Sequence, residues 1–288
     1  MAMRPVFLVS ERNPFYTRWN ATFEYNSGFA PSQKRKNIQA IHDAFSFSFP
    51  GKKVLEISSK SMQEGGEALS AFFLKKFVPS LGESIPVENV YQAGKVFEGG
   101  GPFTDLLQAT PRAAKKDERL RNSGRIVKFC FDGTDFPTDP TTIFYNFIYI
   151  NALLENEELA KTALRYDAFT DIEFNPEKSL NCQAQAAAIF VSLSRQGLIE
   201  KVKDFEEFSK LFLKERTVKP CVLFGKKAQE EKKPAAAYEF AVGEEIEHKT
   251  WGKGMIIKVD DCSLKVKFKT VGEKNMGREW VANHCKKC

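Results

Sequence analysis

The chain has 288 residues, more than one single-core domain usually needs, so we expect one large domain and one smaller one. Hydrophobic residues make up 42% and charged residues 28%, which excludes a wholly disordered or collagen-like protein. The formal net charge is +6, yet residues 1–213 carry 26 basic and 26 acidic side chains, so the whole excess lies in the last quarter of the chain.

Membrane spans and secretory signals are not predicted. The longest apolar stretch, residues 143–154, is interrupted by Asn146 and Asn151 and falls short of the roughly 20 residues that a membrane helix needs. The first ten residues contain Arg4 and Pro5 and lack a long apolar core. Six cysteines are too sparse for a disulfide scaffold. We therefore expect a cytoplasmic protein with reduced thiols and no membrane contact.

Helical patterns outnumber strand patterns up to residue 213, which predicts an α+β domain that is predominantly helical. The expected elements are an amphipathic helix over 31–49, a strand over 54–58, a helix over 86–98, a helical pair over 141–166 with a turn near Asn156, a buried helix over 184–193 closed by Gly197, and a helix over 205–213.

The helix expected over 86–98 carries the most informative spacing. Glu88, Gln92 and Lys95 recur at i, i+4 and i+7 and so share one helix face. A carboxylate in the first turn suits the helix dipole, and a lysine two turns later supplies an amine near the same pocket. Such a pair offers an acid/base group and a nucleophile. A solvated helix face has the same spacing, so spacing alone does not decide. We read the glycine run 99–101 as the helix stop.

A basic segment follows, with only Asp117 and Glu118 in opposition. Its cationic residues are Arg112, Lys115, Lys116, Arg119, Arg121, Arg125 and Lys128. This stripe suits a nucleic-acid phosphate backbone, with Arg112, Lys116, Arg119 and Arg121 as the expected contacts. A solvated helix with internal ion pairs is the alternative.

The composition changes after Leu213. Residues 214–238 are charged and of low complexity, which predicts a tether. Residues 239–288 alternate in short apolar runs between glycines and Asp260-Asp261, which predicts a small all-β unit in the form of a barrel. We therefore divide the chain into a domain over 1–213, a linker over 214–238 and a barrel over 239–288.

Three blocks in the first domain resemble the NADAR superfamily. They are LSAF at 69–72, ENVYQAGK at 88–95, and YDAFTDIEF at 166–174 followed by SLNCQA at 179–184. Ala71, Asn89 and the segment 169–171 depart from the YbiA-like branch. Together with RPVF at 4–7 and EISSKS at 56–61, the segment AFTDIEF resembles instead the NADAR antitoxins encoded beside DarT-type toxins.

That resemblance implies a hydrolase that removes ADP-ribose from guanine in DNA and so reverses the modification made by a DarT-type toxin. It implies Lys95 as an amine nucleophile that forms an imine at the anomeric carbon, and Glu88 as acid/base. The candidates for holding ADP-ribose are Ser70, Phe72, Gln92, Asp171 and Asn181. Plain core packing of Phe72, a helix cap at Ser70 and a turn at Asn181 are the alternatives. No metal or redox cofactor is expected.

The C-terminal residues GEEIEHKTWGKG, at 243–254, resemble the Tudor-like, SH3-type barrel of UvrD/PcrA helicases. The resemblance implies docking on a protein, or on DNA through lysines, and we expect His248 and Trp251 to pack inward. A zinc site formed by Cys285, Cys288, His284 and Cys262 is disfavoured, because structural zinc usually takes two well-spaced ligand pairs.

Two other functions stay open on the sequence. One keeps the fold but cleaves a free nucleotide-type N-glycoside, as YbiA-like relatives do. The other is an antitoxin that blocks its toxin by contact without turnover, a role for which Glu88 and Lys95 would not be needed together.

Overall fold

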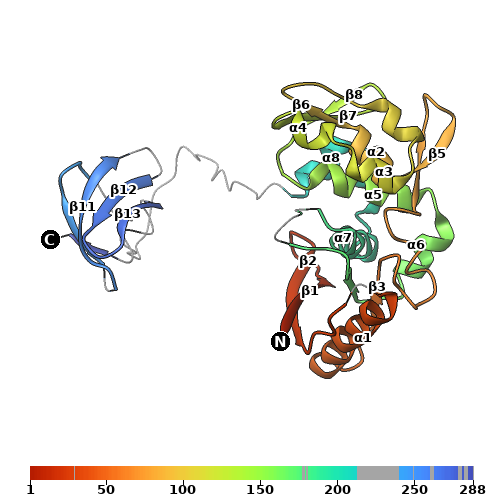
Figure 1. Ribbon diagram of the computed structural model, residues 1–288, viewed down its shortest axis with the longest axis horizontal. Helices are drawn as coiled ribbons and strands as arrows, with labels where there is room; N and C mark the ends of the chain where they lie inside the picture. The colour runs from red at the N-terminus through yellow and green to blue at the C-terminus, as the bar shows by residue number, and fades with distance from the viewer. Residues whose placement is uncertain are drawn as a thin grey trace, which may run out of the picture. The chain divides into compact units, whose positions relative to one another are not determined.

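The structure, a computed structural model, describes residues 1–28, 30–176, 179, 181–212, 240–248, 250–259, 263–277, 281 and 285–287 (Figure 1). The chain divides into two compact units, unit 1 over Met1–Thr217 and unit 2 over Val218–Cys288. The predicted tether over 214–238 lies outside the described residues. Within the described ranges, no helix is long and apolar enough to cross a membrane.

A four-stranded sheet organises one side of unit 1, in the order β2-β1-β9-β3. Its strands are β1 (Ala2–Val9), β2 (Tyr16–Phe23), β3 (Val54–Glu56) and β9 (Ala168–Thr170). The central strand β9 pairs antiparallel with β1 and parallel with β3. The carboxyl ends of β3 and β9 therefore lie at the same edge of the sheet.

Helices cover both faces of this sheet. Helix α1 (Pro31–Ser48) buries Ile38, Ile41 and Phe45, whose spacing gives one apolar face, in a cluster with Val6 of β1. The next strand residue, Phe7, belongs to the other cluster, with α7 (Gln183–Arg195). This alternation is the one a strand buried on both faces requires. The predicted helices over 31–49 and 184–193 are confirmed.

A buried helix, α5 (Ile143–Leu154), occupies the centre of unit 1 and leads into α6 (Glu157–Ala163) through a turn at Asn156, as expected for the predicted helical pair. Tyr149 on α5 donates a hydrogen bond to the carbonyl of Leu69 at 2.7 Å. The remaining helical elements of unit 1 are α2 (Val87–Ala93), η1 (Thr104–Gln108), α3 (Pro111–Lys116), α4 (Arg119–Asn122), η2 (Ile199–Lys203) and α8 (Phe205–Lys210).

Strands contribute more to unit 1 than the sequence predicted, and a predominantly helical domain is not confirmed. A hairpin and a three-stranded sheet add β4 (Lys75–Val78), β5 (Glu83–Pro86), β6 (Lys95–Phe97), β7 (Ile126–Phe131) and β8 (Thr134–Phe136). Several of these strands have only three or four residues, too few for a period of two to be read reliably.

The helix predicted over 86–98 is too long. Helix α2 ends at Ala93, Gly94 follows it in a helical conformation, and Lys95 opens β6 opposite Phe129 of β7. The glycine run 99–101 consequently follows a strand and is not a helix stop. Strand pairing with β7 overrides the local helical preference here, because the carbonyl of Gly94 already accepts the N–H of Cys130 at 2.7 Å.

Gly94 is needed for its lack of a side chain. A Cβ at this position would lie 2.7 Å from the carbonyl oxygen of Cys130 and 3.2 Å from that of Val90. We expect Gly94→Ala to destabilise unit 1 by about 1–3 kcal/mol, because β7 and α2 must separate. Calorimetry of the full chain should show a lower transition for unit 1 and an unchanged one for unit 2. Equal transitions in Gly94→Ala and in the wild type would contradict this close approach.

Unit 2 is a sheet in the order β13-β12-β11-β10-β14. Its strands are β10 (Glu245–His248), β11 (Gly252–Val259), β12 (Ser263–Phe268), β13 (Gly272–Gly277) and β14 (Cys285–Lys287). The rings of His248 and Trp251 lie with their centroids 4.2 Å apart and their planes tilted by 34°, and Trp251 packs on the buried core that includes Phe268. The small all-β unit is confirmed. Among the described residues β13 and β14 do not pair, so closure into a barrel stays a prediction. Of the disfavoured zinc ligands, Cys262, His284 and Cys288 lie outside the described residues.

Candidate active site

Two strand ends bring distant predicted residues to one edge of the main sheet. Asp171 follows β9, and Ile57 follows β3, where its N–H donates to the carbonyl of Thr170 at 2.7 Å. Gln183, at the start of α7, donates to the carbonyl of Ile57 at 2.6 Å and accepts the N–H of Ala71 at 2.7 Å. Carboxyl ends of parallel strands commonly form binding sites, since the loops that leave them diverge there.

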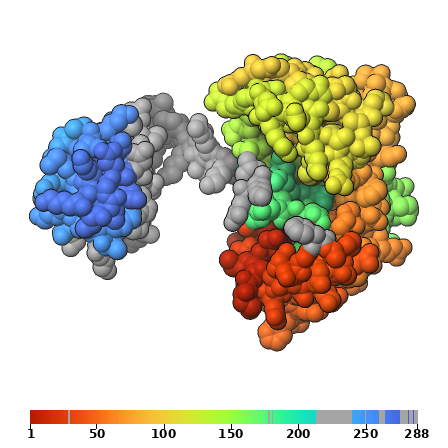
Figure 2. Space-filling view, viewed as in Figure 1, coloured from red at the N-terminus to blue at the C-terminus, as the bar shows by residue number. Residues whose placement is uncertain are grey.

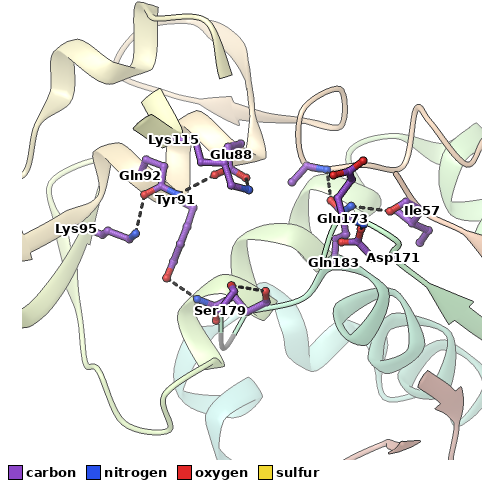
Figure 3. Close-up of polar contacts among 12 residues, drawn as sticks. Ile57, Glu88, Tyr91, Gln92, Lys95, Lys115, Asp171, Glu173, Ser179 and Gln183 are labelled. Carbon is purple, nitrogen blue, oxygen red and sulfur yellow. Dashed lines mark hydrogen bonds and ion pairs between the residues drawn. The ribbon is translucent and has the colours of Figure 1, made fainter. Parts of the chain in front are cut away.

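Glu88, Gln92 and Lys95 form a hydrogen-bonded chain (Figure 3). Glu88 Oε1 accepts a hydrogen bond from Gln92 Nε2 at 2.8 Å, and Gln92 Oε1 accepts one from Lys95 Nζ at 2.6 Å. The predicted proximity of the three side chains therefore holds, although Lys95 belongs to a strand. Because the amide of Gln92 lies between them, Glu88 orients Lys95 through Gln92 instead of contacting it directly.

Burial changes the protonation of Lys95. Its Nζ lies 4.6 Å from the centroid of the Tyr91 ring, which favours the cation. Burial acts in the opposite direction and, with a smaller contribution from Lys115, lowers the pKa of Lys95 to about 8, against the raising effect of Glu88. A substantial fraction of this side chain is therefore the free amine at pH values near 8.

Lys115 brings a second cation to the site from α3. Its Nζ lies 3.4 Å from Glu88 Oε2 and 5.3 Å from the centroid of the Phe72 ring. Glu88 is buried whereas the Lys115 side chain is 57% exposed, so the pair joins a buried acid to a side chain at the rim. Phe72 is half-buried and belongs to none of the hydrophobic clusters of the described residues.

Asp171 shares its surroundings with a second acid, Glu56. Burial, followed by the neighbouring charge of Glu56, raises the pKa of Asp171 well above the usual carboxyl range. Glu56 is fully buried and accepts hydrogen bonds from Thr170 Oγ1 at 2.6 Å and from the N–H of Ile172 at 2.8 Å. Burial also raises the pKa of Glu56. The two acids therefore retain a proton at a pH where isolated carboxyl groups are ionised.

Two predicted residues present buried polar atoms without partners. Ser70 Oγ and Asn181 Oδ1 are buried and make no hydrogen bond among the described residues. The amide nitrogen of Asn181 donates to the hydroxyl of Tyr91. Ser70 Oγ thus caps no helix in this structure. An unsatisfied buried polar atom costs about 1–3 kcal/mol, so both atoms favour a ligand that would complete their hydrogen bonds.

The candidate residues fall into two groups that come from different parts of unit 1. Figure 3 places Lys95, Gln92, Tyr91, Lys115 and Glu88 on one side, and Asp171, Glu173, Gln183 and Ile57 on the other. Figure 2 shows a hollow in unit 1 between the yellow part, which contains α3 and α4, and the red part, which contains β1 and β2. The part at its floor has the colour of α7.

A separate pocket lies behind α2. It is lined by residues that include Val90, Ala93 and Cys130, and it contains none of the predicted site residues. Positions 90 and 93 point away from positions 88 and 92 on a helix. The mostly apolar lining makes this pocket a packing feature and not the candidate site.

Acids from distant parts of the chain neutralise much of the basic segment. Arg119 binds Asp105 at 2.6 Å and Asp117 at 2.9 Å, so its guanidinium already holds two carboxylates, and its contact with phosphate stays a prediction. Further ion pairs are Arg125 with Glu98, Lys128 with Asp135 and Lys115 with Glu88. The other predicted contacts with nucleic acid are exposed and form no ion pair among the described residues. They are Arg112, Lys116 and Arg121.

Sequence reasoning missed four contributors to the site: Glu56, Tyr91, Lys115 and Gln183. Lys115 was assigned only to the basic stripe, because its distance from Glu88 along the chain gives no periodic signal. Gln183 appears in the sequence as a polar residue at the start of an apolar helix. A polar side chain at such a position signals either solvent or a buried partner, and only the fold identifies the partner.

Comparisons with known proteins match two family models to different parts of the chain. A family model described as DarT1-associated NADAR antitoxin matches residues 2–220, and one described as PcrA/UvrD tudor domain matches residues 242–277. A search among curated proteins gave no match. Both resemblances drawn from sequence motifs are confirmed.

Proposed function

The chain belongs to the DarT1-associated NADAR antitoxin family, and from that premise we propose that it hydrolyses ADP-ribose from guanine bases of DNA. On this proposal the protein is an N-glycosidase that reverses the product of a DarT-type DNA ADP-ribosyltransferase. The toxin is its functional partner and ADP-ribosylated DNA its substrate. The PcrA/UvrD tudor match at the C-terminus supports a docking role for unit 2, on a protein or on DNA.

The observation that carries the proposal is the chain from Glu88 through Gln92 to Lys95. It holds an amine of lowered pKa and keeps a buried carboxylate within two hydrogen bonds of it. A contact-only antitoxin gains nothing from a half-buried lysine held partly as the free amine, which costs desolvation energy. This arrangement therefore favours turnover over simple binding.

The reaction follows from the residues. Lys95 Nζ, as the free amine, forms a bond to the anomeric carbon of the ribose while the bond to the guanine nitrogen breaks and that nitrogen takes a proton. The glycosylamine opens its sugar ring to give an imine, with a proton moving to the ring oxygen. Water then adds to the carbon, and collapse of the adduct returns Lys95 as an amine and releases ADP-ribose. Glu88 exchanges protons with the attacking and leaving groups.

The remaining site residues hold the sugar and the leaving base. Asp171, kept partly protonated beside Glu56, donates a hydrogen bond toward the departing guanine or a ribose hydroxyl. Ser70 Oγ and Asn181 Oδ1 offer the unpaired acceptors that ribose or adenosine hydroxyls would fill. Phe72 offers a ring edge to the ligand, with Lys115 above it to pair with phosphate.

A direct substrate comparison tests the proposal. Guanine-modified DNA, thymine-modified DNA and a free nucleotide-type N-glycoside are offered in parallel, and release of ADP-ribose or sugar is followed by mass spectrometry. Release from guanine-modified DNA alone is the expected result. Preference for the free glycoside would favour the YbiA-like activity, and no release from any substrate would favour an antitoxin that acts by contact.

The pH dependence of the covalent step is a second prediction. Attack requires the free amine, so the yield of borohydride-trapped adduct should rise as the pH increases from 6 and level off above the Lys95 pKa of about 8. Trapping is measured on the intact protein at several pH values with guanine-modified substrate. A yield that falls between pH 6 and 8 would exclude Lys95 as the amine that reacts.

A further inference from the structure

A second cationic feature lies at the sheet edge beside Asp171. Strands β1 and β2 form a two-stranded ribbon, and Phe7 of β1 lies opposite Phe169 of β9 in antiparallel register. Residues of β1 before Phe7 therefore run past the carboxyl end of β9, where Asp171 begins the next loop. The first half of β1 and the last half of β2 extend along the edge that holds the candidate active site.

A pocket opens between this ribbon and the loop after Asp171. The ribbon contributes Arg4, Pro5, Arg18 and Asn20, and the loop contributes Asn175 and Pro176. Among the described residues, the lining combines two guanidinium groups with two side-chain amides and includes no carboxylate. Glu173, which lies in the same loop, forms an ion pair with Lys34 at 3.1 Å.

Both arginines have guanidinium N–H groups that are available to a ligand. Arg18 is exposed, and its Nε donates to Asn20 Oδ1 at 3.2 Å, which orients the guanidinium and leaves its terminal nitrogens without a protein partner among the described residues. Arg4 makes a 3.4 Å contact from Nη1 to the carbonyl of Met3, and its Nε is buried without a hydrogen-bond partner. This contrasts with Arg119, whose guanidinium binds two carboxylates.

We propose that this pocket binds backbone phosphates of the DNA strand whose modified base enters the hollow. The inference rests on the proposed function. It adds a further contact with the DNA strand, on the side of the hollow that contains β1 and β2 and lies opposite α3 and α4 (Figures 1 and 2). Phosphate is the ligand that fits, because guanidinium pairs bind it in a planar fork and the side-chain nitrogen of Asn20 adds a neutral donor. A strand suits the pocket better than the diphosphate of ADP-ribose does, because Arg18 and Asn20 are exposed at a rim.

The test measures binding of an unmodified, fluorescently labelled single-stranded DNA to the full chain by anisotropy, at several salt concentrations. The variants are Arg18→Glu, the pair Arg4→Gln with Arg18→Gln, and Arg18→Lys, which keeps the charge. Arg165→Glu is the matched control, since Arg165 is also exposed but precedes the amino end of β9, at the opposite edge of the sheet. Thermal unfolding confirms that each variant folds.

For the double variant we expect affinity to fall roughly fivefold to tenfold. The slope of log K against log salt should fall by about 0.7 for each phosphate of a single strand that the variant no longer neutralises. Arg165→Glu should match the wild type in affinity, and Arg18→Lys should retain most of the binding. Unchanged affinity and slope in the double variant would overturn the proposal. Equal reductions in affinity for free ADP-ribose and for DNA would also overturn it, because the pocket would then serve the diphosphate.

This outcome is separable from that of the proposed function. Unmodified DNA binds without any glycosidic cleavage, so the strand contact is measured independently of turnover. Release of ADP-ribose from a modified mononucleotide, which has no strand, should be unaffected in the double variant. Loss of that release would show that Arg4 and Arg18 serve the reaction site itself, and it would count against a strand subsite.

Discussion

Lys95→Ala is expected to reduce release of ADP-ribose from guanine-modified DNA by roughly 10³-fold or more, as removal of a covalent nucleophile does in other hydrolases. The reason is geometric: Lys95 Nζ is the amine that Gln92 orients at 2.6 Å and that burial keeps partly neutral. The measurement is turnover in the first minutes, with borohydride added to parallel samples and the adduct located by peptide mass spectrometry.

Two variants make this result specific. Lys95→Arg keeps a positive charge at the site but has no free amine near neutral pH, so it should be as inactive as Lys95→Ala and should give no trapped adduct. Lys161→Ala removes an exposed lysine of α6 that pairs with Glu157 and Glu158, and it should leave turnover and trapping unchanged. Full turnover by Lys95→Ala, with no adduct in the wild type, would falsify the imine route.

Glu88→Gln is expected to lower kcat by about 10²- to 10⁴-fold with a smaller change in KM, because a general acid/base contributes that much. The substitution is nearly isosteric, so a carbonyl oxygen can still accept the hydrogen bond from Gln92 Nε2. The loss would therefore report the missing charge and proton and not a collapsed side-chain arrangement.

A pH readout separates this role from a structural one. The charge of Glu88 raises the pKa of Lys95, so its removal should move the rise of borohydride trapping to lower pH while turnover falls. A merely structural defect would lower trapping at every pH without moving the rise. Asp105→Asn is a matched control, since Asp105 is an exposed acid that pairs with Arg119 and takes no part in the hydrogen-bonded chain from Glu88 to Lys95. Wild-type kcat in Glu88→Gln would rule out the acid/base assignment.

The identity of the chemical groups was predictable from the sequence, but their supporting contacts were not. Glu88 and Gln92 lie one helical turn apart, so their contact follows from the helix alone. Lys95 reaches Gln92 for another reason: α2 ends at Ala93, and the chain turns through Gly94 into β6 while staying next to the helix end. The expected proximity of the three side chains was right. The expected helix at Lys95 was wrong, because this residue lies in a strand.

The basic segment shows the limit of reading charge along the chain. Its opposing acids were expected to be Asp117 and Glu118, whereas the structure adds carboxylates from Glu88, Glu98, Asp105 and Asp135. These acids lie outside the segment or on a neighbouring strand. A stripe that appears strongly cationic in sequence is therefore partly neutralised by ion pairs. Arg4 and Arg18, isolated in sequence, share one pocket whose described lining residues include no acid.

The sequence by itself determined the division into two units and the long amphipathic and buried helices. It also determined the family motifs that contain Glu88 and Lys95. These features depend on composition and on periodicities within a single segment. Only the tertiary structure decided which charges are paired, that Glu56 lies beside Asp171, and that Lys115 and Gln183 join the site. Ion pairing and pKa shifts depend on distance and burial in space, and residues far apart in the chain acquire both only when the strands and helices pack together.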